Sequence, residues 1–136
     1  MSVAQKLILV IDDEPAIGRI IKVNLERRGY RVEISVDSVA ALELLRNGHL
    51  RPDLILSDVT MPYMDGIELL TRVKSDPDLA AIPFVMVTAR SRDADIIAGR
   101  ERGALHYLTK PIVLEELFEV VEQTIGSAEG AESASQ

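Results

Sequence analysis

Five short apolar runs limit what this chain of 136 residues can fold into. They lie at residues 7–11, 32–36, 54–56, 84–87 and 107–108, and each has the length of a β-strand. Because they are continuously apolar rather than alternating, they are typical of a parallel sheet that helices cover on both faces. The runs therefore predict a sheet with a buried core on each side.

The segments between these runs carry apolar residues at helical spacing. They predict helices over residues 15–28, 38–47, 65–76, 91–103 and 114–125. Pro15 suits a first helical turn, Ser38 and Asp65 are the expected N-caps, and Pro77 follows the third helix. The helix over residues 91–103 has the thinnest apolar face, so we expect it to be the least firmly packed.

Strands that alternate with helices in this way predict a three-layer α/β fold. We expect one flavodoxin-like (βα)5 domain over residues 1–125, with a doubly wound five-stranded parallel sheet in the order 2-1-3-4-5. Residues 126–136 contain no large apolar residue. They predict a disordered C-terminal tail or linker.

The composition argues against several classes of function. Fifteen basic and 22 acidic residues give a net charge of −7, so we expect no direct nucleic-acid binding. The absence of cysteine excludes disulfides, a thiolate nucleophile and a thiolate-ligated metal. The longest apolar stretch, residues 7–11, is too short for a membrane span or a signal-peptide core. We expect a soluble, cytoplasmic protein.

Acidic residues follow two of the predicted strands. Asp12, Asp13 and Glu14 follow the first strand, and Asp58 follows the third. Neighbouring parallel strands end about 5 Å apart at the edge where ligands bind, so the carboxylates of Asp12, Asp13 and Asp58 are expected to converge. Two such charges repel by about 3 kcal/mol at an effective dielectric of ~20. Oxygen ligands without histidine or cysteine suit Mg²⁺, which would relieve this repulsion.

Two more polar residues follow the remaining strands. Lys110 follows the fifth strand, and its long stem can bring an ammonium back over Asp58, while Thr88 follows the fourth strand as a hydroxyl donor. Taken singly, each residue has an ordinary explanation as a turn aspartate, a surface lysine or a strand threonine. Taken together, they favour a site for a metal and an anion.

The order of these motifs resembles the receiver domain of two-component response regulators. The resemblance covers residues 6–125 and is carried by the segments LVIDDEP at 9–15, DVTMPYMDG at 58–66, VTA at 87–89 and YLTKP at 107–111. It implies a signalling switch that is activated by phosphorylation. Such a domain is not a turnover enzyme, since it catalyses only its own phosphorylation and dephosphorylation.

The resemblance also implies residue roles. Asp58 would accept a phosphoryl group from a histidine kinase or a histidine phosphotransfer protein. Lys110 would pair with the phosphoryl oxygens, and Thr88 would hydrogen-bond one of them. The Mg²⁺ ligands would be Asp13, Asp58, the backbone carbonyl of Thr60 and, mainly through metal-bound water, Asp12.

Phosphorylation would be transmitted by a pair of switch residues, Thr88 and Tyr107. The resemblance implies that the fourth helix, fifth strand and fifth helix then bind a downstream protein, in a monomer or a phosphorylation-dependent dimer. It also implies a cis bond between Lys110 and Pro111. Neither Thr60 nor Arg90 carries a carboxylate or carboxamide that could orient water, so we expect slow self-dephosphorylation.

Other functions stay open at this point. The chain could be a phosphate sink, or a receiver module excised from a longer response regulator or hybrid kinase. An aspartyl-phosphate phosphatase of the haloacid dehalogenase type needs a second aspartate two residues after its nucleophile, and neither Asp12 nor Asp58 has one. A flavodoxin-like FMN carrier is disfavoured because the loop after the first strand is acidic.

Overall fold

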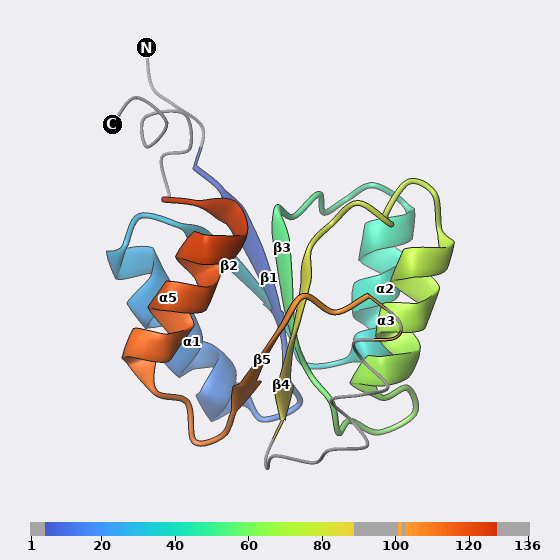
Figure 1. The fold of residues 1–136 in the computed structure, drawn as a ribbon. Coiled ribbons are helices and arrows are strands. Elements are labelled where there is room, and N and C mark those ends of the chain that lie inside the picture. Colours follow the sequence, from blue (N-terminus) through green and yellow to red (C-terminus); the bar gives the residue numbers. More distant parts are fainter. Residues whose placement is uncertain (1–4, 89–100, 102, 128–136) are drawn as a thin grey trace.

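The computed structural model describes residues 5–88, 101 and 103–127, which form helices packed on one sheet (Figure 1). In chain order the elements are β1 (Leu7–Ile11), α1 (Pro15–Arg27), β2 (Arg31–Ser35), α2 (Ser38–Arg46), β3 (Leu54–Asp58), α3 (Gly66–Ser75), β4 (Phe84–Thr88), β5 (His106–Thr109) and α5 (Leu114–Ile125). The five strands are parallel and lie in the order β2-β1-β3-β4-β5. The predicted α/β fold and its strand order are confirmed.

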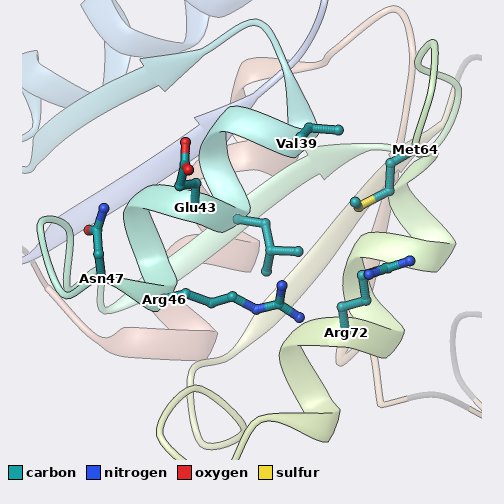
Figure 2. A pocket seen from close by; sticks show the side chains of 7 residues that line it. Val39, Glu43, Arg46, Asn47, Met64 and Arg72 are labelled. Carbon is teal, nitrogen blue, oxygen red and sulfur yellow. The ribbon is translucent and has the colours of Figure 1, made fainter.

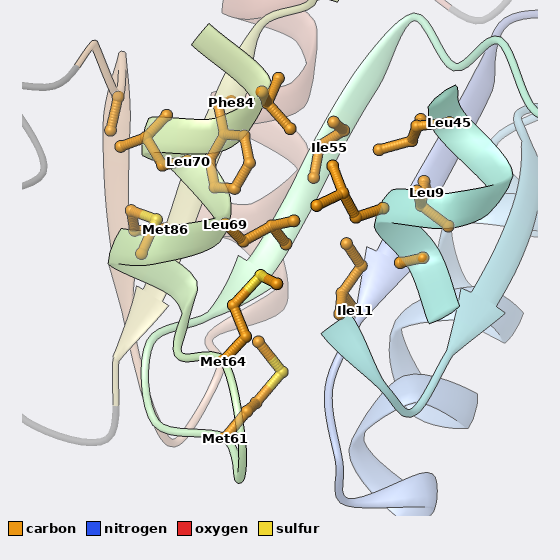
Figure 3. Close-up of a cluster of buried hydrophobic side chains, with 14 of the residues drawn as sticks. Leu9, Ile11, Leu45, Ile55, Met61, Met64, Leu69, Leu70, Phe84 and Met86 are labelled. Carbon is orange, nitrogen blue, oxygen red and sulfur yellow. The ribbon is translucent and has the colours of Figure 1, made fainter. Parts of the chain in front are cut away.

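Helices cover both faces of the sheet, so two separate cores form. The helices α1 and α5 lie on one face, and α2 and α3 lie on the other (Figure 1). Figure 3 shows the core under α2 and α3, where Ile55 and Phe84 of the sheet meet Leu69 of α3. Every residue of β1, β3 and β4 is buried. The strand β1 coincides with its predicted apolar run, whereas β3 and β4 extend beyond theirs to Asp58 and Thr88.

The edge strand β2 differs from this expectation. It begins at Arg31 rather than at Val32, and its first three residues alternate between exposed and buried. Val36, the predicted last residue of the strand, lies beyond β2 and is half exposed. A strand with a neighbour on only one side leaves part of its surface to solvent, which explains why Glu33 is tolerated within it.

Three residues, Pro15, Ser38 and Asp65, were predicted to mark the starts of helices, and two of these predictions are confirmed. Pro15 is the first residue of α1. Asp65 caps α3, since its Oδ1 accepts a hydrogen bond of 2.8 Å from the amide of Glu68. The same helix ends at Ser75, shortly before Pro77, as expected.

The predicted cap of α2 is wrong by one residue. Asp37 is the N-cap, and its Oδ1 accepts from the amide of Val39 at 2.8 Å. Ser38 is instead the first helical residue and is buried, and its hydroxyl donates to the carbonyl of Met64 at 2.5 Å. Aspartate is as good an N-cap as serine, so Asp37 can take this position. The Ser38 hydroxyl instead connects α2 to the loop that contains Met64.

The last helix is fastened at its C-terminal end. The Lys6 ammonium donates to the carbonyl of Ile125. The Tyr30 hydroxyl donates to the carbonyl of Gly126 at 2.7 Å. Carbonyls at the end of a helix have no partner within the helix, so these two side chains satisfy them and hold α5 against the start of β1 and the α1–β2 turn.

Several predictions fall outside the described residues. The helix predicted at 91–103 is described only at residues 101 and 103, and the tail predicted at 126–136 is described only at 126 and 127. Both stay predictions. In the described parts of the chain, no helix has the length and apolar character needed to cross a membrane.

Candidate functional site

The strand register brings the predicted site residues to one edge of the sheet. Ile11 of β1 lies beside Ser57 of β3, so Asp12 and Asp58 follow at neighbouring strand ends. On the other side of Asp58, Thr88 closes β4 beside Thr109 of β5. The polar groups therefore gather at the carboxyl edge because parallel strands end together there.

Three carboxylates form an acidic cluster, which we define as Asp12, Glu14 and Asp58. One oxygen from each lies within 4.8 Å of the others. Asp12 is only 2% exposed and Asp58 only 5% exposed, whereas the Glu14 side chain is 63% exposed. The expected convergence is thus observed for Asp12 and Asp58, which are buried, while the third carboxylate lies at the surface.

The membership of this cluster differs from the expected set in one residue. Asp13 is exposed and does not share the cluster in this structure, and Glu14 takes the third place. The Glu14 amide donates to Asp12 Oδ1 at 2.9 Å, and Glu14 itself is extended. The chain bends at Asp13 between them, and this bend brings Glu14 to the cluster.

Lys110 lies at the centre of the acidic cluster. Its Nζ lies 3.0 Å from Asp12 Oδ2, 3.0 Å from Glu14 Oε1 and 3.2 Å from Asp58 Oδ2. The Lys110 amide donates to the Thr88 carbonyl at 2.7 Å, which extends the pairing of β4 and β5. The bond to Pro111 is cis, as the resemblance implied. The expected reach of this side chain back over Asp58 is confirmed.

This ammonium offsets part of the negative charge of the three carboxylates. Burial disfavours the charged form of Lys110, but hydrogen bonds to Asp12 and Glu14 and the attraction of Asp58 outweigh burial, so the Lys110 pKa is raised. The lysine therefore stays protonated over the whole physiological pH range.

Asp58 sits in surroundings that oppose its charge. Burial raises its pKa above the usual 3.8, and the neighbouring Asp12 carboxylate raises it further. The charge of Lys110, its hydrogen bond and the Thr60 amide, 3.4 Å from Oδ1, lower the pKa but leave a net increase. A buried carboxylate beside a second one gains from any added cation.

The loop after β3 packs closely against the backbone of Asp58. Gly66 starts α3, and its amide donates to the Val59 carbonyl at 2.7 Å. A Cβ atom on Gly66 would lie 2.2 Å from the Asp58 carbonyl oxygen, so only glycine fits there. Between them Met64 is buried, and Tyr63 is 95% exposed with a φ of 71°. The nucleophile candidate therefore sits on a closely packed turn.

Thr88 and Tyr107 lie on neighbouring strands. Thr88 is buried at the end of β4. Tyr107 is half buried in β5, pairs with Met86 in the register and packs against the core under α2 and α3. Met86 and Thr88 are two residues apart, so both predicted switch residues face this side of the sheet. Ala89 and Arg90 lie outside the described residues.

A groove of about 530 Å³ runs between α2 and α3 (Figure 2). The residues that line it are Val39, Leu42, Glu43, Arg46, Asn47, Met64 and Arg72. Arg72 is held by Glu68 of its own helix at 2.8 Å. None of the lining residues belongs to the acidic cluster, so the groove supplies no further group to the site.

Sequence comparison identifies the family. Residues 8–122 match the response regulator receiver domain. The DNA-binding dual master transcriptional regulator RpaA of Synechocystis sp. (strain ATCC 27184 / PCC 6803 / Kazusa) is 41% identical over 111 residues, which are 82% of this chain and 45% of RpaA. The chain thus spans about half the length of the curated relatives it matches.

Structure comparison agrees. The chemotaxis protein CheY4 of Vibrio cholerae aligns with a TM-score of 0.81 and 30% identity, covering 89% of this chain and 99% of that chain. The receiver domain of sensor histidine kinase PA1611 from Pseudomonas aeruginosa PAO1, with a magnesium ion in its active site cleft, aligns with a TM-score of 0.80 and 28% identity, covering 91% and 100%. With the family match over residues 8–122, these findings show that the chain belongs to the response regulator receiver domains.

Proposed function

We propose that this receiver domain is a switch that accepts a phosphoryl group on Asp58 from a histidine kinase or a histidine phosphotransfer protein. The observation that carries the proposal is the Lys110 ammonium held within about 3 Å of Asp58 and Asp12 at the carboxyl edge of the sheet. A carboxylate nucleophile and a fixed cation for the incoming phosphate thus lie side by side. Catalysis is limited to the domain's own phosphorylation and dephosphorylation.

The donor set of the site fits Mg²⁺. All the candidate ligand atoms are oxygens, and those of the acidic cluster lie within 4.8 Å of one another. We propose the ligands Asp12, Asp13, Asp58 and the backbone carbonyl of Thr60, with Asp12 acting mainly through metal-bound water. Asp13 lies at the surface and follows Asp12 directly in the chain. When bound, Mg²⁺ neutralises the charge that develops on the phosphoryl oxygens.

The residues of this chain position and stabilise the transferred group. A carboxylate oxygen of Asp58 attacks phosphorus in line as the phosphorus–nitrogen bond of phosphohistidine breaks, and the imidazole leaves with that electron pair. Lys110 pairs with one phosphoryl oxygen, and the Thr88 hydroxyl donates to another. Phosphoryl transfer depends mostly on such positioning and charge neutralisation.

Phosphate is then sensed away from Asp58. We propose that Thr88 and Tyr107 respond to the phosphoryl group and alter the face that includes β5 and α5, where a downstream protein binds. The net charge of −7 argues against contact of this domain with a phosphodiester backbone, although the relative RpaA is named as DNA-binding. A phosphate sink would use the same chemistry without this response.

Phosphorylation with a small donor tests the proposal. Acetyl phosphate and Mg²⁺ should add one phosphoryl group to the intact chain by mass spectrometry, and hydroxylamine should remove it. Asp58→Asn should abolish labelling, whereas Asp78→Asn, an exposed aspartate outside the acidic cluster, should be labelled like the unaltered chain. Labelling of Asp58→Asn at the unaltered level would refute the assignment.

A further inference from the structure

Glu14 contacts the lysine of the site from a different position than the two aspartates. Its Oε1 accepts from Lys110 Nζ at 3.0 Å, as Asp12 Oδ2 does, but the Glu14 side chain is 63% exposed while that of Asp12 is 2% exposed. The ammonium is therefore held between two buried carboxylates and one at the surface. Glu14 is thus the exposed member of the acidic cluster, and it shares the Lys110 ammonium with the two buried aspartates.

The backbone of Glu14 is fixed on both sides. Its amide donates to Asp12 Oδ1 at 2.9 Å, and its carbonyl accepts from the amides of Ile17 at 3.1 Å and Gly18 at 3.3 Å in the first turn of α1. Its side chain makes no capping hydrogen bond to the helix. The position of this carboxylate is thus set by the main chain, and its contact is Lys110 rather than the helix.

A divalent cation and Lys110 draw on the same carboxylates. Asp12 and Asp58 each have an oxygen within 3.2 Å of the ammonium, and both are proposed to serve the metal. An ammonium that had only these two buried oxygens as partners would oppose the cation by repulsion and by occupying its ligands. A third partner on the solvent side reduces this competition.

We propose that Glu14 is a positioning residue that shares the Lys110 ammonium with Asp12 and Asp58, which weakens the hold of the ammonium on these two aspartates and so favours Mg²⁺ binding there. The inference rests on the proposed function. When a phosphoryl group reaches Asp58, its oxygens replace Glu14 as the partner of Lys110. Glu14 therefore affects how tightly the metal binds more than how fast phosphorus is transferred.

Replacement of Glu14 should separate these two effects. In Glu14→Gln the ammonium loses the charge of its outer partner and is held more strongly by Asp12 and Asp58, which it already contacts. The Mg²⁺ dissociation constant, measured by calorimetry without phosphodonor, should therefore rise about three- to tenfold. At saturating Mg²⁺ the rate of phosphorylation by acetyl phosphate should not fall, since Lys110 is no longer shared with Glu14. Glu116→Gln, an exposed glutamate of α5, is the control and should change neither value.

Two further variants show whether Glu14 acts through Lys110. Glu14→Asp keeps the charge but shortens the reach, so it should weaken Mg²⁺ binding in the same direction as Glu14→Gln. In a Lys110→Met background, Glu14→Gln should raise the dissociation constant less than it does when Lys110 is present, because only the direct attraction of the Glu14 charge to the cation remains.

The outcomes distinguish this inference from the proposed function. Equal Mg²⁺ affinity in the unaltered chain and Glu14→Gln would overturn the inference alone, as would an undiminished effect in the Lys110→Met background. A reduced rate at saturating Mg²⁺ would place Glu14 in the transfer step instead and would also overturn it. Failure of the unaltered chain to bind Mg²⁺ would overturn both proposals.

Discussion

Asp58 shows how one residue joins stability to function. The proposed nucleophile must be accessible to phosphorus, yet the Asp58 carboxylate is 5% exposed and lies beside Asp12. Burial and the Asp12 charge raise its pKa, and Lys110 offsets only part of that effect. Below its raised pKa the folded state gains from a proton on Asp58, and above it the folded state holds a charge in surroundings that disfavour it.

Asp58→Asn should therefore melt at a higher temperature than the unaltered chain in metal-free buffer near neutral pH. Because the folded-state pKa is raised, the stabilising proton is fully bound below the ordinary value of 3.8 and is lost as the pH rises through the raised value. The advantage of the variant should grow across that interval and then stay constant, reaching several degrees. Thermal unfolding at a series of pH values measures it. A lower melting temperature at every pH would contradict the raised pKa.

Gly66 should be required for the position of Asp58. In Gly66→Ala the new methyl group would meet the Asp58 carbonyl at 2.2 Å and Met86 Cε at 2.9 Å, so the turn must shift. We expect a stability loss of about 1–3 kcal/mol, which is typical of overpacking, and phosphorylation slowed at least about tenfold. Gly18→Ala is the matched control, since its methyl group would meet only the Ile34 side chain at 3.1 Å. Similar kinetics for both variants would contradict the argument.

At the scale of elements, β4 and β5 are the pair that can carry the response to phosphate. Thr88 ends β4 at the site, and Tyr107 packs in β5 against the same face of the sheet. The Lys110 amide also bonds to the Thr88 carbonyl at 2.7 Å, so the two strands are joined where the phosphoryl group would sit. Any movement of this threonine is thus placed to reach β5.

Amide exchange with beryllofluoride and Mg²⁺ as the phosphoryl mimic should show this coupling. Exchange should change in β5 as well as in the loops around Asp13 and Asp58, and Thr88→Ala should confine the change to those loops. Thr109→Ala, which removes an exposed hydroxyl from the residue paired with Thr88, should leave the pattern intact. Changes confined to the site in the unaltered chain would indicate a phosphate sink instead.

Elements were predictable from sequence where local chemistry decided them. Pro15 and Asp65 mark the starts of α1 and α3 because proline is favoured in the first turn of a helix and aspartate at its N-cap. Asp37 and Ser38 are both good N-caps. The hydrogen bond from Ser38 to Met64, in the loop after β3, is a long-range contact that the local sequence does not reveal. The exposed side of β2 likewise follows from its place at the edge of the sheet, which a local pattern does not contain.

The site was predictable as a set of strand ends but not as a set of contacts. Asp12, Asp58, Thr88 and Lys110 meet because the strand order fixes which ends are neighbours. The choice of Glu14 over Asp13 depends on the local direction of the chain after β1. Lys110 contacts all three carboxylates because of its side-chain conformation, which no motif specifies.

At the scale of the whole molecule, the tie between Lys6 and Ile125 has a topological consequence. The two residues lie 119 positions apart in the sequence yet meet at one point, with Tyr30 and Gly126 joined beside them. The chain thus enters and leaves the domain at nearly the same place. Such a domain can be inserted within a longer polypeptide with little change in the distance between its flanking segments, and a short covalent link between these ends would convert the backbone into a closed ring open to circular permutation.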